Sequence, residues 1–510
     1  MAGFLLAGIP AAALLLWHNA YWHAGADLSN LPAPRRYWED VAVAATRYLD
    51  GGGEAAKVSI NSADGAELRL GFQRYLTRSA AEAGVPPWKF WRTIPVRPLL
   101  KGRRLMPREI DDPGRAGLLT AGFRLLRGVA PFLPLWLGAL VAVPVLAWAA
   151  AELARAGRTV AGISFTLLAA CSPYVVDSLS LPYSAVGFYL IALVAILPLA
   201  TYAVSSDVRA TGLAARSLAA GAVFALCVLC RSGSLFLLPG FVVALAAGAW
   251  RLRARRAAPG RTAWRLVHAA VVLALFVTPY AIVRQPRHHE VWLGLWEGLG
   301  DFDRTKGHAW NDDVAREVLR RAGMAPPERY PVWENALENE ALFRRLVVVD
   351  VRSAPEWYAG ILARRLWVTL TQIKLSPWAP RDGLSVAPRR SSNEGAIDTY
   401  YAMATPADRI GLGPWRFELP LVLLWEPTLL LILLFGLARG IARLRPWATR
   451  LGPALFAMLC MAVAALSLPV LFTTASGLET QAFVMVYFLG VAFLLDEALR
   501  YKRAAGLPAG

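Results

Sequence analysis

The sequence predicts an all-α polytopic membrane protein with about ten transmembrane helices, and three observations support this fold class. Long apolar runs recur along the 510 residues, of which 56% are hydrophobic. Arginine gathers in alternate connections between these runs, and two long polar segments, 19–128 and 286–413, interrupt them. Most of the runs reach the ~20 residues that a helix needs to cross ~30 Å of hydrocarbon.

The first apolar run, 3–18, is short and contains Pro10. The small residues Ala24-Gly25-Ala26 after it would also suit a signal-cleavage site. We favour a retained first helix, which places both termini in the cytoplasm. The remaining runs lie at 129–152, 159–176, 182–204, 216–230, 233–250, 266–284, 418–438, 451–473 and 480–496.

The charge of the short connections orients the chain. When the runs alternate in direction, the tight basic loops all fall on one side, which is the cytoplasmic side by the positive-inside rule. The arginines and lysine concerned are Arg155, Arg158, Arg209, Arg216, Arg251, Arg253, Arg255, Arg256, Arg261, Arg265, Arg439, Arg443, Arg445, Arg450, Arg500, Lys502 and Arg503. Residues 19–128 and 286–413 are therefore expected to be extracytoplasmic.

Composition argues against nucleic-acid binding and redox chemistry. The net charge is +18, but much of the excess is arginine at helix ends, where anionic headgroups also attract it. All four cysteines lie in apolar runs. Cys227 and Cys230 have a C-x-x-C spacing without a partner pair, so they are expected to be small buried residues rather than metal ligands.

The chain is accordingly expected to divide into alternating membrane and outer parts. These are a first transmembrane helix (1–18), a first outer loop (19–128), a transmembrane bundle (129–285), a second outer segment (286–413), C-terminal transmembrane helices (414–498) and a cytoplasmic tail (499–510).

The two outer segments contain amphipathic patterns. In the first, helices are predicted from Trp38 to Leu49 and over 66–83. In the second, helices are predicted near 311–323, 334–350 and 354–374. The apolar face of 66–83 and of 354–374 is expected to lie flat on the membrane helices. Segment 354–374 could instead be an eleventh span, but Arg364, Arg365 and Lys374 argue against its deep burial in the membrane.

Candidate chemical groups gather on the outer face. The acidic candidates are Glu39, Asp40, Asp111, Asp112 and Asp177. The basic candidates are Arg231, Lys101, Arg103 and Arg104, and His288 stands beside His289 outside the expected seventh span. Each is also what a solvated loop or a helix cap would show, and the basic, Trp-rich stretch around Lys101 would also suit an interfacial anchor. Because all of these residues are expected on the same outer face, we favour a functional role over these structural ones. The sequence has no Walker A loop, G-x-S-x-G or H-E-x-x-H motif.

Several of these stretches resemble the polytopic GT-C glycosyltransferases, in particular the bacterial branch related to protein mannosyltransferases and lipid A sugar transferases. The similar stretches are Asp111 to Leu119 with Phe123 to Gly128, Ser172-Pro173-Tyr174 with Tyr183-Ser184, Cys230 to Gly233 with Pro239, and His288 to Asp313. They follow the family's order over most of the chain, although each motif is loose.

The resemblance implies inverting transfer of a sugar from a polyprenyl-phosphate donor to a glycan, lipid or protein acceptor outside the cytoplasm, at a bacterial inner membrane. The family's base opens a helix in the first outer loop as an Asp-Glu pair. Here the match is Glu39-Asp40, in reversed order, with Asp111 or Asp112 as substitutes. Arg231, the Lys101 cluster, Asp177 and His288 would bind substrate. No metal ligand set is predicted, and the need for a divalent cation stays open.

Two other classes remain as alternatives. A transporter or lipid-linked glycan flippase is disfavoured by the long outer segments and by the scarcity of charges within the apolar runs. A relative that has lost its base would keep the fold without the activity.

Overall fold

The computed structural model is helical over nearly all of the residues that it describes, as the sequence predicts. One short antiparallel ribbon, β1 (Arg409–Leu412) with β2 (Trp415–Glu418), is the exception among them. The structure describes residues 9–23, 81–84, 133–171, 185–203, 208–230, 232–254, 291–302, 305–309, 312–324, 337–371, 409–412, 415–418 and 482–504, with single residues near 118–126, at 175 and 179, and within 463–472.

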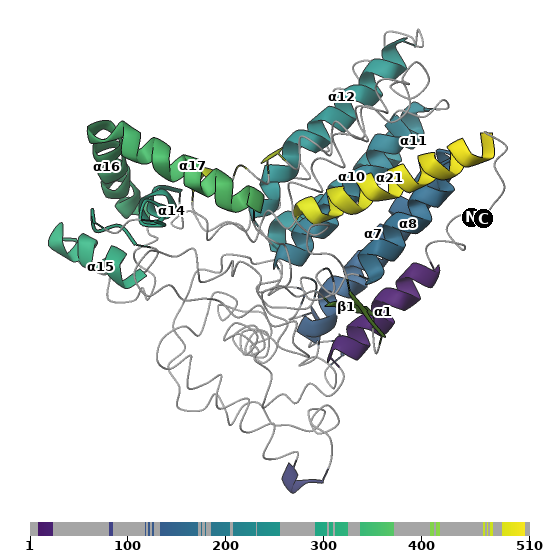
Figure 1. Ribbon diagram of the computed structural model, residues 1–510, viewed down its shortest axis with the longest axis horizontal. Helices are drawn as coiled ribbons and strands as arrows, with labels where there is room; N and C mark the ends of the chain where they lie inside the picture. The colour runs from purple at the N-terminus through teal and green to yellow at the C-terminus, as the bar shows by residue number, and fades with distance from the viewer. Residues whose placement is uncertain are drawn as a thin grey trace.

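A bundle of roughly parallel and antiparallel helices forms the larger part (Figure 1). Its members are α1 (Ile9–His23), α7 (Leu133–Arg155), α8 (Thr159–Cys171), α10 (Ala185–Ala203), α11 (Ala210–Cys230), α12 (Leu238–Ala254) and α21 (Ala482–Ala504). Helix α10 packs against α7, α11 and α12, whereas α8 lies between α7 and α21. Helix α1 packs against α7 and α8.

Two of the described helices are long and apolar enough to cross a membrane, Trp136–Arg155 and Ala210–Cys230. Each of them spans about 30 Å at 1.5 Å per residue. Thr159–Ala170 and Val194–Ala203 are shorter apolar helices. The expected span 266–284 lies outside the described residues, as does 418–438 except for Glu418, the last residue of β2, and 451–473 is described only in part.

Short connections reverse the chain between neighbouring bundle helices. At one end, the turn from α7 to α8 uses Gly157, whose positive φ of 77° suits a residue without a Cβ. At the other end, a 3₁₀ segment η4 (Ser232–Leu237) joins α11 to α12. The Ser234 hydroxyl donates to the Cys227 carbonyl (3.3 Å) and ties this segment to the last turn of α11.

A second, smaller group of helices extends sideways from the bundle (Figure 1). It consists of α14 (Val291–Gly298), α15 (Asp312–Arg321), α16 (Leu337–Ser353) and α17 (Pro355–Thr371), and we call it the outer module. The last three coincide with the helices predicted near 311–323, 334–350 and 354–374. Pro355 occupies the first position of α17, where its missing N–H costs nothing and its fixed φ suits a helix start.

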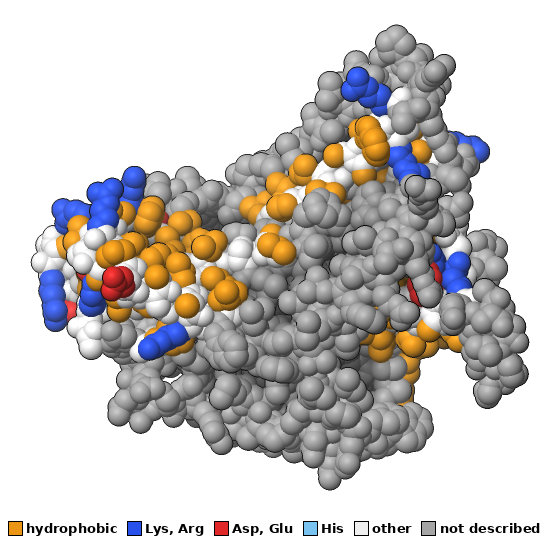
Figure 2. Space-filling model, turned by 45° about the horizontal axis from the view of Figure 1, so that its top comes forward, with side chains coloured by type: hydrophobic (Ala, Val, Ile, Leu, Met, Phe, Trp, Pro, Cys, Tyr) orange, Lys and Arg blue, Asp and Glu red, His pale blue; other side chains and the backbone are white. Residues whose placement is uncertain are grey.

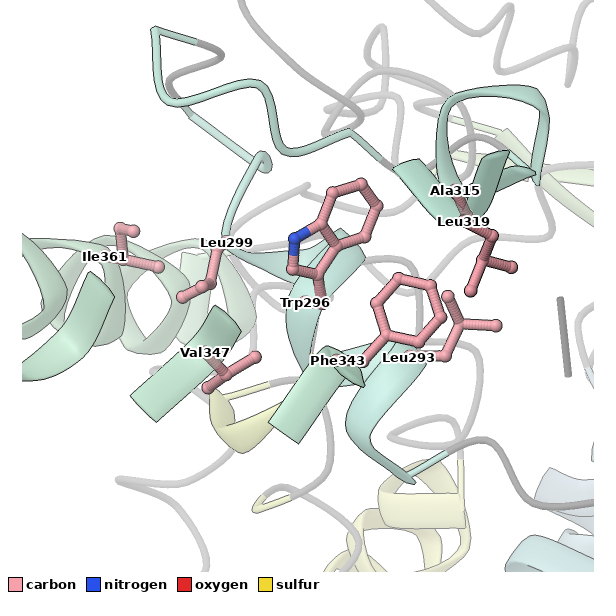
Figure 3. Close-up of a cluster of buried hydrophobic side chains, with 8 residues drawn as sticks. All are labelled: Leu293, Trp296, Leu299, Ala315, Leu319, Phe343, Val347 and Ile361. Atoms are coloured by element: carbon pink, nitrogen blue, oxygen red, sulfur yellow. The ribbon is translucent and has the colours of Figure 1, made fainter. Parts of the chain in front are cut away.

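The outer module has its own hydrophobic core (Figure 3). All four helices contribute to it, with Leu293, Trp296, Leu299, Ala315, Leu319, Phe343, Val347 and Ile361 buried together. The Trp296 and Phe343 rings are 5.3 Å apart between centroids, and they form its centre. The apolar face of 354–374, where Ile361 is buried and Trp357 and Tyr358 are partly buried, contributes to this core and packs against α14 and α16.

Candidate functional site

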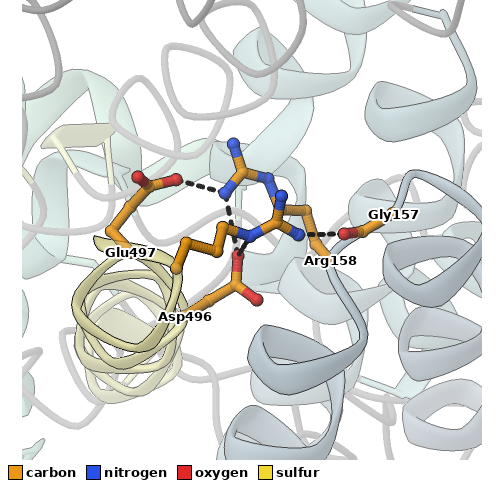
Figure 4. Close-up of polar contacts among 5 residues, drawn as sticks. Gly157, Arg158, Asp496 and Glu497 are labelled. Carbon is orange, nitrogen blue, oxygen red and sulfur yellow. Dashed lines mark hydrogen bonds and ion pairs between the residues drawn. The ribbon is translucent and has the colours of Figure 1, made fainter. Parts of the chain in front are cut away.

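Arginines from separate connections meet at one end of the bundle. Arg158, in the turn between α7 and α8, pairs with Asp496 (2.8 Å) and with Glu497 on α21. Arg500 on α21 also pairs with Asp496 (2.8 Å) and donates to the Gly157 carbonyl (Figure 4). Asp496 is 1% exposed, so two guanidinium groups compensate one buried carboxylate.

A second carboxylate at the same end gathers two more of these arginines. Glu152 on α7, which is 3% exposed, accepts hydrogen bonds from Arg155 and from Arg216 on α11 (3.1 Å). The Arg216 guanidinium also lies 3.9 Å from the ring centroid of Tyr202 on α10. We call this part of the bundle the basic end. Its helix ends are joined by Glu152, Arg158, Arg216, Asp496 and Arg500. The α7–α8, α10–α11 and C-terminal connections, which the sequence places on one side, thus do lie together.

The outer module is fastened to residues 470–472, which precede α21 and so lie toward its other end. Arg365 on α17 donates to the carbonyls of Val470 (3.3 Å) and Leu471 (3.1 Å). It also donates to the Asp301 carboxylate (2.9 Å), and both side chains are 0% exposed. A guanidinium group at these carbonyls satisfies acceptors at a helix end and opposes the negative end of the helix dipole. We call this group the junction.

The charge state of the junction follows from its burial. Burial lowers the pKa of the Arg365 guanidinium from its ordinary value, and the neighbouring Asp301 carboxylate acts in the opposite direction. Arginine stays protonated in proteins, so a positive charge faces the Asp301 carboxylate where neither side chain is exposed. Arg365 is thus buried within the protein, whereas α17 is not among the described helices that are long and apolar enough to cross a membrane.

Glycine residues allow the close approach of backbone at the junction. A Cβ at Gly298 would overlap the Phe472 carbonyl oxygen, and one at Gly300 would overlap the His308 carbonyl oxygen. The Gly298-Leu299-Gly300 stretch lies within the segment that resembles the family. Its two glycines are explained in this chain by close packing against backbone carbonyls.

The cap of α14 comes from another helix. The Glu340 carboxylate of α16, 7% exposed, accepts from the backbone N–H groups of Trp292 (2.9 Å) and Leu293 (3.1 Å). These amides belong to the first turn, where they have no intrahelical acceptor. Glu340 therefore fixes the direction of α14 and, through it, the position of Gly298 at the junction.

A histidine–carboxylate pair lies closer to the surface of the outer module. His308 Nε2 is 2.9 Å from an oxygen of Asp350, and Lys306 Nζ is 4.0 Å from the other oxygen. His308 is 2% exposed, whereas Asp350 is 28% exposed. Trp296 packs edge-on against the imidazole at 5.2 Å, and Lys306 lies 4.3 Å from the Trp357 ring centroid. The hydrogen bond between His308 and Asp350 ties residues 305–309 to α16.

None of the sequence-predicted site residues lies within the described part of the chain. Glu39, Asp40, Asp111, Asp112, Arg231, Lys101, Arg103, Arg104, Asp177 and His288 are all outside it. The neighbours of two of them are placed. Leu179, close to Asp177, packs its backbone against Gly138 near the start of α7, the end opposite Arg155. Cys230 and Ser232, on either side of Arg231, lie where α11 gives way to η4.

Sequence reasoning did not single out Asp301, His308, Asp350 or Glu340. One signal was available for Asp350, which interrupts the apolar stretch Leu346 to Val351 near the end of a predicted helix. Asp301 and Glu340 stand in polar surroundings in the sequence, and their burial arises only from long-range contacts.

Metal binding has no support from the described residues, in which no group of three or more His, Cys, Asp or Glu side chains could hold an ion. Comparison with family models, with curated proteins and with solved structures finds no match to this chain.

Proposed function

We propose that the protein is a polytopic glycosyltransferase of the GT-C type, which transfers a sugar from a polyprenyl-phosphate donor to an acceptor on the extracytoplasmic side of a bacterial inner membrane. The observation that carries the proposal is the polarity of the molecule. Arginine-bearing helix ends meet at the basic end, and a folded helical module is attached toward the opposite end. With about ten spans and the basic end in the cytoplasm, the outer module lies outside.

The charge distribution along the bundle supports an enzyme over an ion-coupled transporter. In the described bundle helices, the Asp, Glu, Lys and Arg residues lie in the turns nearest the basic end: Glu152 and Arg155 on α7, Arg216 on α11, Arg251 and Arg253 on α12, and Asp496, Glu497, Arg500, Lys502 and Arg503 on α21. A coupling site would require charged groups near the midplane.

The chemistry proposed is an inverting displacement. The acceptor hydroxyl oxygen attacks the anomeric carbon, its proton passes to a carboxylate, and the lipid phosphate leaves with the electrons of the broken C–O bond. Asp40 is the preferred base, with Glu39 next and Asp111 or Asp112 as substitutes. Arg231, with Lys101, Arg103 and Arg104, would stabilise the charge on the leaving phosphate, and Asp177 and His288 would contact substrate.

The test is transfer rate measured beside thermal stability, on the full chain with polyprenyl-phosphate sugars. Asp40→Asn and Glu39→Gln should identify the base by a loss of roughly a hundredfold or more. A helix cap would instead cost about 1 kcal/mol of stability with turnover intact. Asp350→Asn is a control at the described His308–Asp350 pair. Asp111→Asn is a control at the other acidic position of the first outer loop. Native turnover in Asp40→Asn and Glu39→Gln places the base elsewhere.

Orientation is tested independently of activity. Ser62→Cys and Ser391→Cys should react with an impermeant thiol reagent in intact cells. Protection of both would reverse the orientation. A flippase would instead translocate a lipid-linked glycan in vesicles without forming a new glycosidic bond.

A further inference from the structure

The arginines on the outer side of α16 and α17 differ from those of the basic end. Arg344, Arg345, Arg352 and Arg364 are exposed, and none of the four forms an ion pair with a carboxylate among the described residues. Arg344 and Arg364 each lie over an aromatic ring, at 5.7 Å from Trp292 and 5.9 Å from Phe302. Their guanidinium groups therefore face solvent with their charge uncompensated by a described acid.

Apolar side chains are exposed beside these arginines. Val349 is 57% exposed and lies one turn from both Arg345 and Arg352 on the same side of α16. Leu366 on α17 is also 48% exposed, but it lies with Ala359 and Ala363 on the side of that helix away from Arg364. Figure 2 shows basic side chains gathered at the end of the outer module farthest from the bundle, with apolar side chains between them and the bundle.

The position of the outer module relative to the bundle indicates which partner its exposed arginines contact. It is fixed at the junction by Arg365 and Gly298, and it extends sideways from the bundle in both views (Figures 1 and 2). Helix α17 runs across the direction of the bundle helices rather than along it (Figure 1). In a bilayer, a helix that leaves the outer end of a bundle in this way runs at the level of the lipid headgroups.

We propose that Arg345, Val349 and Arg352, one stripe of α16 that we call the outer basic face, rest on anionic phospholipid headgroups of the outer leaflet. The guanidinium groups pair with the headgroups, and Val349 enters the boundary between headgroups and acyl chains. The feature recognised is the net negative charge of the anionic bulk lipid around the protein. This inference rests on the membrane orientation of the proposed function but not on its catalysis.

The test uses the full chain in nanodiscs, with Cys171, Cys227, Cys230 and Cys460 replaced by serine or alanine. A nitroxide label at Val349→Cys reports collision with a water-soluble nickel chelate and with lipid-soluble oxygen. Ala322→Cys, on the exposed turn after α15, is the matched control. In discs containing phosphatidylglycerol, we expect the Val349 label to be protected from the chelate and accessible to oxygen, and the Ala322 label to show the reverse.

Charge dependence separates headgroup binding from simple burial. Replacing Arg345 and Arg352 with glutamine should abolish the protection at Val349, and so should discs of phosphatidylcholine alone. Equal chelate accessibility at both labels overturns the proposal. So does protection that persists in the arginine variant, in phosphatidylcholine or in detergent, because a protein surface would then cover the face. Transfer activity measured on the same samples reports separately on the proposed function.

Discussion

The basic end and the junction both use arginine to hold helices together, but they solve different problems. At the basic end, Asp496 binds two arginines that are themselves 11% and 46% exposed, so water and alternative partners remain close. At the junction, Arg365 and Asp301 are both wholly buried. At the basic end, removal of one arginine leaves a second arginine that still pairs with Asp496. At the junction, removal of Arg365 takes the guanidinium group away from a wholly buried carboxylate.

This contrast predicts which ion pairs the fold depends on. A network with several guanidinium groups per carboxylate tolerates single losses, because the remaining arginine still compensates the buried charge. At the junction both side chains are wholly buried, so water cannot replace a lost guanidinium group. The geometry of the junction, however, gives a fixed orientation, since Arg365 must reach Asp301 and the carbonyls of Val470 and Leu471 at once.

The largest expected effect is at the junction. Arg365→Met should destabilise the protein by about 3–5 kcal/mol, because it removes the buried guanidinium group that faces the Asp301 carboxylate and the carbonyls of Val470 and Leu471. Thermal unfolding of the reconstituted chain measures the loss, and proteolysis should show the outer module released first. Arg364→Met is the control, since Arg364 is an exposed neighbour, and it should change stability by less than about 0.5 kcal/mol. Equal effects of the two variants would remove the distinction between the two regions.

The second prediction concerns the backbone contact at the junction. Gly298→Val should cost about 1–3 kcal/mol or separate α14 from residues 470–472, because a side chain would overlap the Phe472 carbonyl oxygen. Gly294→Ala in the same helix has open space around its Cβ and should be neutral or stabilising by up to about 1 kcal/mol. Hydrogen exchange over 291–300 would report the difference, and similar protection in both variants would exclude the close contact.

At the basic end, redundancy itself can be tested. Arg158→Gln and Arg500→Gln should each have a modest effect, because the other arginine still pairs with Asp496. The double variant should lose more than the sum of the two, with a coupling energy of about 0.5–3 kcal/mol. Additive losses would show that the two arginines act independently rather than substituting for each other at Asp496. Arg155→Gln, at a 54% exposed side chain, should cost about 1 kcal/mol or less.

The smallest effect is expected on the surface of α15. Hydrogen bonds from Arg321 and Arg320 lower the pKa of Glu317 from its ordinary value. A depressed carboxylate pKa adds stability above the unfolded-state pKa, and the gain is lost as pH falls through the folded-state pKa. The protection factors of the α15 amides should therefore fall as the pH decreases, and Glu317→Gln should remove this dependence. An unchanged acid profile in that variant would assign the effect to another group.

Apolar patterning identified much of the molecule from the chain alone. It placed helices at α7, α10 and the three later helices of the outer module to within a few residues, because period and length are local properties. It also placed the start of α21, but this helix continues to Ala504, beyond the predicted end at 496. Arginine placement predicted that the α7–α8, α10–α11 and C-terminal connections share a side, and Arg158, Arg216 and Arg500 do lie together. The candidate catalytic and binding residues, from Glu39 to His288, remain predictions outside the described residues.

Only the tertiary structure determines which groups pair with the buried charges. Arg365 and Asp301 are separated by 64 positions in the chain, and Arg158 and Asp496 by 338. Nothing in the local composition around Arg365 distinguishes a buried ion-paired arginine from an interfacial one. Burial of a charge depends on whether a distant carboxylate arrives to compensate it. Sequence therefore determined where helices form and which ends are basic, and long-range packing determined which charges could leave water.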